Sequence, residues 1–397
     1  MTDLYLTGIG HLTTHDGDPV TDAVVVIEGG RITYAGKAGD APAKGNIPAL
    51  DCGERAVIPG FVDAHTHLVF AGERADEFRR RMGGEPYQSI AASGGGILST
   101  VRATRTATDE ELYQLAAARV TRMIAAGTVA IEVKSGYGLD TATEARLLDV
   151  ARRIGDELPV SVKTTFLGAH SVPSEYEGDR DGYIDLIVEE MLPAMAGRAD
   201  YCDVFVEEGV FSVDEARVIF EAAAGFGLRA RVHAEQLGHS GGALLAAELG
   251  AASADHLDHA TPDDAAALAA AGVAAVLVPG ASYTLRSQQA PGPMLWAAGC
   301  VVAIATDCNP GTSYLEAMGL AISLAVVQMG LTVDQALWAS TRGGALSLGL
   351  ADHGMLRPGA VGDLVVLDAP SPVHIAYRPA TNLAWATVRH GAISHRV

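Results

Sequence analysis

Short apolar runs alternate with alanine-rich stretches through most of this 397-residue chain. Eight of the runs have the length and composition of buried strands. They cover residues 57–62, 128–133, 160–167, 201–206, 230–233, 253–255, 274–278 and 301–305. Helical patterns, such as residues 110–126 and 142–154, lie between most of them. Eight strand–helix repeats over about 300 residues predict a (β/α)8 TIM barrel, which is an α/β fold.

Both ends of the chain contain strand patterns outside this repeat. Residues 23–28 and 31–35 are separated by Gly29-Gly30, which is a hairpin signature, and residues 362–368 read as a buried strand. Neither end holds enough strands for a stable sheet by itself. We therefore expect a small β-sandwich domain built from residues 1–57 and 355–397, and a barrel from residues 58–354.

Polar residues that could carry chemistry follow the predicted strands at the points where these strands end. They are His65, His67, Lys134, Tyr137, His170, Glu207, Glu208, His233, His256 and Asp307. In a TIM barrel the active site lies at the carboxyl ends of the strands, so this distribution predicts an active site there. The stretch 70–105 is long for a loop and contains Gly94-Gly95-Gly96. We expect it to form a mobile lid.

The pentapeptide Asp63-Ala64-His65-Thr66-His67 predicts a metal site. In an extended strand, residues two apart share one face, so two imidazoles can bind one metal ion. His233 follows the fifth predicted strand and Asp307 follows the eighth. Three imidazoles and one carboxylate suit Zn²⁺ or Fe²⁺ without choosing between them, and we expect water as a further ligand. The alternative is four unrelated polar residues, which their common position after strands disfavours.

Several longer motifs resemble the amidohydrolase superfamily and, within it, the imidazolonepropionase family. The similar segments are residues 59–70 (PGFVDAHTHLVF), 94–97 (GGGI), 132–139 (EVKSGYGL), 165–170 (TFLGAH), 253–257 (SADHL) and 305–311 (ATDCNPG). The resemblance implies hydrolytic ring opening of 4-imidazolone-5-propanoate to N-formimidoyl-L-glutamate in histidine degradation. It also implies one Zn²⁺ or Fe²⁺/Fe³⁺ ion per subunit and a homodimer.

The fourth predicted strand ends in Phe205-Val206-Glu207-Glu208-Gly209, without a lysine. Superfamily members with two metals commonly carry a carbamylated lysine there, so its absence implies a single metal. Lys134 and Lys163 lie on other predicted strands and do not obviously replace it. Glu207 and Glu208 could be ligands or salt-bridge partners within the barrel, and we favour the structural role.

The resemblance assigns acid–base work to two residues. Asp307 is expected to hold the metal and to accept a proton from the attacking water. His256 is expected to hydrogen-bond the developing oxyanion or to carry a proton. The alternative for His256 is a buried structural histidine that bonds Asp255 or Asp258.

Substrate contacts follow from the same resemblance. Arg74 can hold the propionate with two parallel hydrogen bonds, although Arg79, Arg80 and Arg81 are nearby competitors. The remaining expected contacts are Tyr137, His170, Gln236, Asn309, Gly311 and Thr312. Tyr137 could instead pack in the core, and Asn309 could be only a turn residue.

Gln236 stands where related deaminases carry a glutamate, three residues after His233. An amide cannot exchange a proton as a carboxylate does, so Gln236 is predicted to contact the substrate and not to act as a base. Glu235 stays a second candidate for proton transfer, because its direction depends on how the fifth strand ends.

Bulk composition argues against several classes of partner. The net charge is −20 and no basic patch stands out, which argues against nucleic acid. The four cysteines form no close pair and fit a reducing cytoplasm, and no signal peptide is visible. The uncharged stretches 265–285 and 317–333 read as a helix end with a buried strand and as a buried helix, not as membrane spans.

Two other functions remain open at this stage. One is a related amidohydrolase or aminohydrolase that acts on another heterocyclic substrate with the same ligand set. The other is a metal-free barrel that serves as a binding module.

Overall fold

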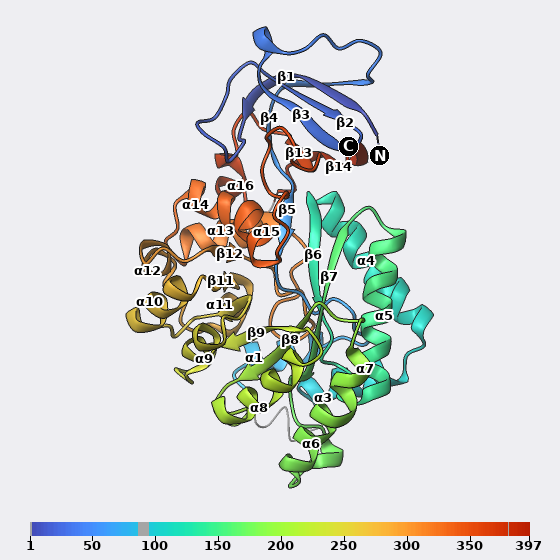
Figure 1. Cartoon of the computed structure of the whole chain (residues 1–397), viewed down its shortest axis with the longest axis vertical. Coiled ribbons are helices and arrows are strands. Elements are labelled where there is room, and N and C mark those ends of the chain that lie inside the picture. The colour runs from blue at the N-terminus through green and yellow to red at the C-terminus, as the bar shows by residue number, and fades with distance from the viewer. Residues whose placement is uncertain (1, 86–94, 380) are drawn as a thin grey trace.

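The computed structural model describes residues 2–85, 95–379 and 381–397. Its described elements form two sheets (Figure 1). An eight-stranded sheet lies in the middle of the molecule with helices around it, and a seven-stranded sheet lies at one end. This arrangement confirms the predicted fold class, a TIM barrel with a small β domain made from both termini.

The central sheet contains only parallel neighbours, in chain order from one edge to the other. Its strands are β5 (Phe61–Asp63), β6 (Thr128–Lys134), β7 (Ser161–Ala169), β8 (Tyr201–Val206), β9 (Arg229–Ala234), β10 (Ser253–His256), β11 (Ala274–Leu277) and β12 (Val302–Ile304). The residues that follow β5 and β12 close the ring: Thr66 and Cys308 form a parallel bridge. The Asp307 amide donates to the His65 carbonyl at 2.9 Å. Barrel closure therefore passes directly through the predicted metal ligands.

Helices connect these strands and surround them (Figure 1). The described α-helices are α1 (Ala75–Met82), α3 (Ile97–Thr106), α4 (Asp109–Ala125), α5 (Thr141–Glu157), α6 (Arg180–Leu186), α7 (Leu192–Met195), α8 (Val213–Ala224), α9 (Gly242–Leu249), α10 (Pro262–Ala271), α11 (Pro279–Leu285), α12 (Gly292–Ala297), α13 (Met318–Val327), α14 (Val333–Trp338), α15 (Gly344–Ser347) and α16 (Val373–Tyr377). Several begin at a capping box, in which a hydroxyl and a side chain three residues later satisfy backbone amides reciprocally. Thr108 with Glu111 and Ser212 with Glu215 are two of these pairs.

The terminal sheet has the order β15-β14-β13-β4-β1-β2-β3. Its strands are β1 (Leu4–Leu12), β2 (Ala23–Glu28), β3 (Arg31–Lys37), β4 (Ala49–Pro59), β13 (Leu364–Leu367), β14 (Ala384–Arg389) and β15 (Ala392–Arg396). Alternate side chains from both chain ends, such as Leu6, Val25, Leu364 and Val388, pack in one buried cluster. Two strand-rich termini thus bury a shared core that neither could form alone. The domain limits at 57/58 and 354/355 stay a prediction.

The predicted hairpin and the predicted strand 57–62 had different outcomes. β2 and β3 pair antiparallel across Gly29-Gly30, whose φ angles are 59° and 78°. Positive φ at both turn positions matches the twist of a two-residue hairpin, which confirms the prediction. The strand 57–62 is wrong: β4 ends in the terminal sheet at Pro59, and β5 begins in the barrel at Phe61. His65 and His67 follow β5 and do not lie within it.

The stretch 70–105 is not a continuous loop, because α1 and α3 occupy much of it. Residues 86–94, including Gly94, lie outside the described residues, so the lid stays a prediction. The stretch 265–285 contains α10, the buried strand β11 and α11, and the helix expected at 317–333 is shorter, α13. Among the described helices, none combines the length and apolarity that a bilayer crossing requires.

Gly60 is the only residue between β4 and β5, and it has no room for a side chain. A Cβ there would lie 2.5 Å from Cγ2 of Val129. Gly60→Ala should therefore lower the free energy of unfolding by about 1–3 kcal/mol, as overpacking of a tight core does. Urea unfolding followed by circular dichroism measures this.

Gly39→Ala is the matched control, because nothing lies within 4 Å of a Cβ at that position. It should leave the unfolding midpoint nearly unchanged. Equal stability of the Gly60→Ala and wild-type proteins would contradict the tight crossing between the two sheets.

Candidate metal centre

A cavity of about 580 Å³ opens at the carboxyl ends of the barrel strands. Its walls include most of the residues that the sequence singled out: His67, Arg74, Tyr137, His170, His233, Gln236, His256, Asp307, Asn309, Gly311 and Thr312. His65 is fully buried and adjoins this wall through His67. The barrel thus brings together side chains that lie up to about 245 residues apart in the sequence.

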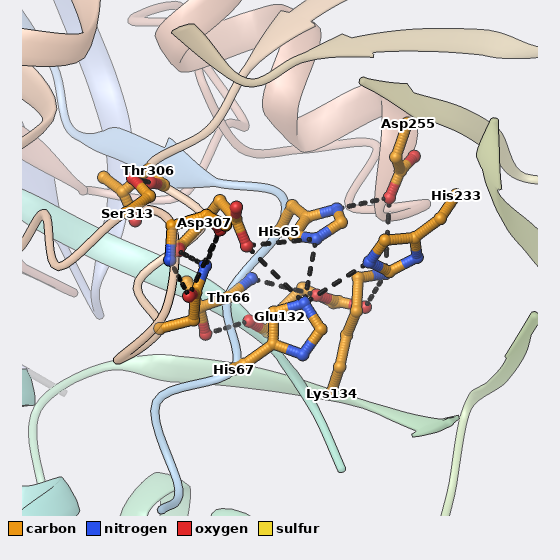
Figure 2. Close-up of polar contacts among 12 residues, drawn as sticks. His65, Thr66, His67, Glu132, Lys134, His233, Asp255, Thr306, Asp307 and Ser313 are labelled. Carbon is orange, nitrogen blue, oxygen red and sulfur yellow. Dashed lines mark hydrogen bonds and ion pairs between the residues drawn. The ribbon is translucent and has the colours of Figure 1, made fainter. Parts of the chain in front are cut away.

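Three histidines point their Nε2 atoms at one another (Figure 2). The Nε2 atoms of His65 and His67 are 3.1 Å apart, and those of His67 and His233 are 3.4 Å apart. Asp307 Oδ1 lies 3.5 Å from Nε2 of both His65 and His67. A tetrahedron of donors at about 2.0–2.1 Å from a metal has edges of roughly 3.3 Å. The three histidines therefore group as ligands of a single metal ion, and Asp307 lies beside two of them as the candidate fourth ligand.

Buried carboxylates determine which nitrogen carries the proton in two of the three rings. His65 Nδ1 lies 2.7 Å from Asp255 Oδ2, and His233 Nδ1 lies 3.0 Å from Asp203 Oδ2. Because a carboxylate only accepts, both Nδ1 atoms must donate, and in the neutral ring Nε2 keeps its lone pair. His67 Nδ1 is buried without a hydrogen-bond partner among the described residues, and its Nε2 lies 3.1 Å and 3.4 Å from the other two Nε2 atoms. This donor set fits a transition-metal ion.

Burial keeps the rings of His65 and His67 neutral. The pKa values of His65 and His67 lie well below the usual range, first because burial penalises the charged ring and then because cationic neighbours such as Lys134 oppose it. Burial also raises the pKa of Asp307, although hydrogen bonding from Asn309 and the charge of Lys134 favour its ionised form. A carboxylate in this position requires a compensating cation, which a bound metal would supply.

A layer of buried charge lies against the histidines. Lys134 Nζ is 2.6 Å from Asp203, 2.9 Å from Glu132 and 3.3 Å from Asp255. The Arg231 guanidinium is 3.5 Å from Asp255 and 3.6 Å from Glu132. The three acids come from β6, β8 and β10, which are alternate strands, and one interior layer of a TIM barrel is built from alternate strands. Lys134 is thus a charge partner of three carboxylates.

Arg74 enters the cavity from the residue that precedes α1. Its Nε donates to Glu77 Oε2 at 2.8 Å, and Glu77 also accepts from the Gly96 amide at 3.1 Å. A Cβ on Gly311 would lie 2.4 Å from Arg74 Nη1, so the guanidinium occupies space that only glycine leaves open. Arg74 is therefore positioned in the cavity wall, whereas Arg79 is largely exposed and pairs with Asp76.

Asn309 organises the turn that follows β12. Its Oδ1 accepts the amides of Gly311 and Thr312 at 2.8 Å each, and its Nδ2 donates to the Asp307 carbonyl at 2.7 Å. The turn role that the sequence left open is therefore real, and the same turn forms part of the cavity wall. A contact of these three residues with substrate stays a prediction.

Tyr137 and His170 form an aromatic wall beside the metal site. The rings of His67 and His170 stack with centroids 5.1 Å apart, and Tyr137 lies 5.5 Å from His170. His170 Nδ1 donates to the Gly136 carbonyl at 2.9 Å, and burial, followed by the charge of His233, lowers the pKa of His170 to about 3. Its Nε2 is therefore an acceptor. Tyr137 is buried, as the packing alternative requires, yet it also lines the cavity.

The structure places Glu235 and Gln236 on different sides of the chain. Glu235 has φ 55° and its carboxylate accepts the amides of Ser240, Gly241 and Ala243, at the start of α9. Gln236 lines the cavity. Glu207 similarly accepts the Leu237 amide at 2.8 Å, in line with a structural role. Glu235 therefore supports the fold, whereas Gln236 faces the cavity.

His256 ends β10 with φ 76°, an unusual backbone conformation for a residue that is not glycine. Its ring lies edge-on to His65, with centroids 5.2 Å apart, and 5.1 Å from the ring of His233. Its Nδ1 is buried without a hydrogen-bond partner among the described residues. Asp255 is engaged by His65 and Lys134, and Asp258 accepts from Ser282 at 2.7 Å.

The sequence patterns did not find the whole site. The cavity is also lined by Arg81, which was named as a competitor of Arg74, and by Ile97, Ser171, Phe205, Val210, Leu237 and Leu285. The sequence patterns gave no role to Glu132, Asp203 or Arg231. A signal for these was available, because a charged residue within a predicted buried strand requires a buried partner.

Comparison with known proteins agrees with this geometry. The family model described as "Amidohydrolase family" matches residues 56–389. A curated imidazolonepropionase of Streptomyces griseus is 46% identical over 98% of this chain and 99% of its own length. Those of Streptomyces coelicolor and Myxococcus xanthus are 47% and 48% identical, over 97% and 95% of this chain and 97% and 91% of their own lengths.

Solved structures with lower sequence identity share the fold. A 5-methylcytosine deaminase from Klebsiella pneumoniae superposes with a TM-score of 0.77 at 18% identity, covering 99% of this chain and 97% of that one. An N-isopropylammelide isopropylaminohydrolase from Burkholderia multivorans gives a TM-score of 0.74 at 22% identity, with both chains fully covered. With the match to the family model and the identity to curated relatives over nearly the whole length, the chain belongs to the amidohydrolase family and, within it, to the imidazolonepropionases.

Proposed function

We propose that this protein opens the ring of 4-imidazolone-5-propanoate by hydrolysis and releases N-formimidoyl-L-glutamate, a step of histidine degradation. One observation carries the proposal. Three imidazole Nε2 atoms and a carboxylate converge at the base of a cavity whose wall also presents an arginine. The metal site suits a substrate that requires water addition, and the arginine suits a negatively charged one. A small anionic heterocycle therefore fits this cavity.

His65, His67, His233 and Asp307 would hold one Zn²⁺ or Fe²⁺/Fe³⁺ ion per chain. Bound there, the ion would lower the pKa of a water molecule towards about 7 and polarise the ring carbonyl. The absence of a lysine at the end of β8 supports a single ion, because Lys134 is already committed to three carboxylates.

Asp307 and His256 are the proposed acid–base pair. Asp307 would accept a proton from the water as it attacks the carbonyl carbon of the ring amide. His256 is neutral, because burial and then the charge of His233 lower its pKa. It would hydrogen-bond the oxyanion that develops at the carbonyl oxygen, and proton delivery to the departing ring nitrogen would complete cleavage of the C–N bond.

Arg74 would hold the propionate group, and the aromatic wall of Tyr137 and His170 would pack against the flat ring. Gln236, Asn309, Gly311 and Thr312 would supply the remaining polar contacts. Gln236 offers both a donor and an acceptor and no acidic proton, which suits orientation of the substrate. We propose a homodimer from the family resemblance alone and a cytoplasmic location from the four free cysteines. Size-exclusion chromatography with light scattering tests the dimer.

Asp307→Asn should lower turnover by a factor on the order of 10²–10⁴, because the amide cannot accept the proton of the attacking water. The measurement is consumption of the imidazolone, followed spectrophotometrically, with the metal content of each preparation determined. Circular dichroism verifies the fold. Near-normal turnover by a folded, metal-loaded Asp307→Asn protein contradicts this mechanism. Ammonia release without ring opening would instead indicate an aminohydrolase.

Arg74→Ala should lower kcat/KM by roughly 10–100-fold, mainly through a higher KM, because a charge-assisted pair with the propionate is worth about 1.5–3 kcal/mol. Arg79→Ala is the matched control, in the helix that Arg74 precedes, and should behave as wild type, since Arg79 pairs with Asp76 at the surface. An unchanged KM in Arg74→Ala would remove Arg74 from substrate binding.

A further inference from the structure

A second group of possible metal ligands lies outside the barrel cavity. His353 follows α15, Asp363 directly precedes β13, and His390 lies in the turn between β14 and β15. One donor atom from each of the three residues lies within 4.8 Å of the others. These residues come from three separate segments, and the catalytic proposal uses none of them.

The backbone around this group is held tightly. The His390 amide donates to Asp363 Oδ1 at 2.7 Å, and the Gly391 amide donates to the Gly362 carbonyl at 3.1 Å. The Gly60 amide donates to the Asp363 carbonyl at 3.1 Å, at the crossing between the two sheets. Main-chain contacts therefore position the segments that carry Asp363 and His390.

Two buried polar atoms of the group lack a hydrogen-bond partner. Asp363 is 2% exposed and His353 is 8% exposed. Asp363 Oδ2 and His353 Nε2 have no such partner among the residues that the structure describes. They face each other at 3.8 Å, which is too long for a hydrogen bond. Buried polar atoms are nearly always satisfied, so this pair calls for a ligand between them.

The proton on His353 is placed as in the barrel site. His353 Nδ1 lies 3.0 Å from Asp352 Oδ1, and the other oxygen of Asp352 lies 2.9 Å from Arg31 Nη2. The ionised Asp352 can only accept, so Nδ1 donates, and in the neutral ring the lone pair of Nε2 faces Asp363. A carboxylate on Nδ1 and a lone pair on Nε2 is the arrangement of His65 with Asp255.

An imidazolium–carboxylate pair is the competing explanation, but the 3.8 Å separation is too long for the hydrogen bond that it requires.

We propose that His353, Asp363 and His390 bind a divalent transition-metal ion of the zinc type, separate from the ion in the barrel. Two imidazoles and one carboxylate are typical Zn²⁺ donors and leave a fourth position for water. An ion there would cross-link the loop after α15, the start of β13 and the β14–β15 turn. Its role would be to hold the terminal sheet to the barrel.

The test counts ions per chain in untagged, full-length protein that has been stripped with a chelator and dialysed against Zn²⁺. Wild type should retain two ions per chain by elemental analysis, and His390→Asn should retain one with hydrolytic activity within about twofold of wild type. Asparagine is chosen because residue 390 has φ 49°, which asparagine tolerates. The control His395→Gln changes a histidine of β15 outside the group and should retain two ions.

His353→Gln provides an independent second variant. A wild-type protein with one ion per chain overturns the proposal, as does a second ion that both variants retain. If neither variant folds, His65→Gln decides the question by removing a ligand from the barrel site only. One retained ion supports the second site, and no retained ion overturns it.

Discussion

The buried ion cluster inside the barrel determines the chemistry at its mouth. Glu132, Asp203 and Asp255 surround Lys134, and Arg231 closes the group from β9. Placing these charges in a dry interior carries a large desolvation cost, and removing one partner from such a cluster typically costs about 3–5 kcal/mol. This cost serves the function of the site, because Asp255 and Asp203 fix the tautomers of His65 and His233. Burial opposes ionisation of these two carboxyls, but interactions with His233 and Lys134 at Asp203, and with Arg231 and Lys134 at Asp255, lower their pKa values.

Strained backbone at the strand ends completes the site. Glu235, His256 and Asp307 all have positive φ, at 55°, 76° and 52°. Such conformations cost about 1–3 kcal/mol each and persist only where surrounding contacts enforce them. Asp307 is held by the hydrogen bond that its amide donates to the His65 carbonyl. Glu235 is held by three amides near the start of α9, which donate to its carboxylate. Each turn ends its strand and re-aims the side chains that follow. Of the proposed ligands, Asp307 lies at such a position, whereas His233 lies within β9.

The fold and the convergence of the four candidate ligands could be predicted because their signals are local. Each barrel strand is an apolar run, and His65, His67, His233 and Asp307 lie at the ends of such runs or just after them. The break at Gly60 could not be predicted, since residues 57–62 read as one apolar run although they belong to two sheets.

Directions and distant partners were also beyond the sequence. Gln236 and Glu235 are neighbours, and only the positive φ of Glu235 decides which of them faces the cavity. The partner of His65 is Asp255, 190 residues away, and no local pattern connects them. The sequence pattern could show that Asp255 lies in a buried strand and requires a partner, but only the closed barrel identifies that partner.

The most direct test of the central claim is the metal affinity of Asp203→Asn. Its readout is the free Zn²⁺ concentration that restores half of the ring-opening activity to chelator-treated enzyme, which reports the barrel site alone. Asp200→Asn is the matched control, because Asp200 bonds Lys163 and Thr164 and no histidine. If Asp203 orients His233, the Asp203→Asn protein should require about 10–100-fold more Zn²⁺ while the control resembles wild type. A folded Asp203→Asn protein with wild-type Zn²⁺ dependence would contradict the claim.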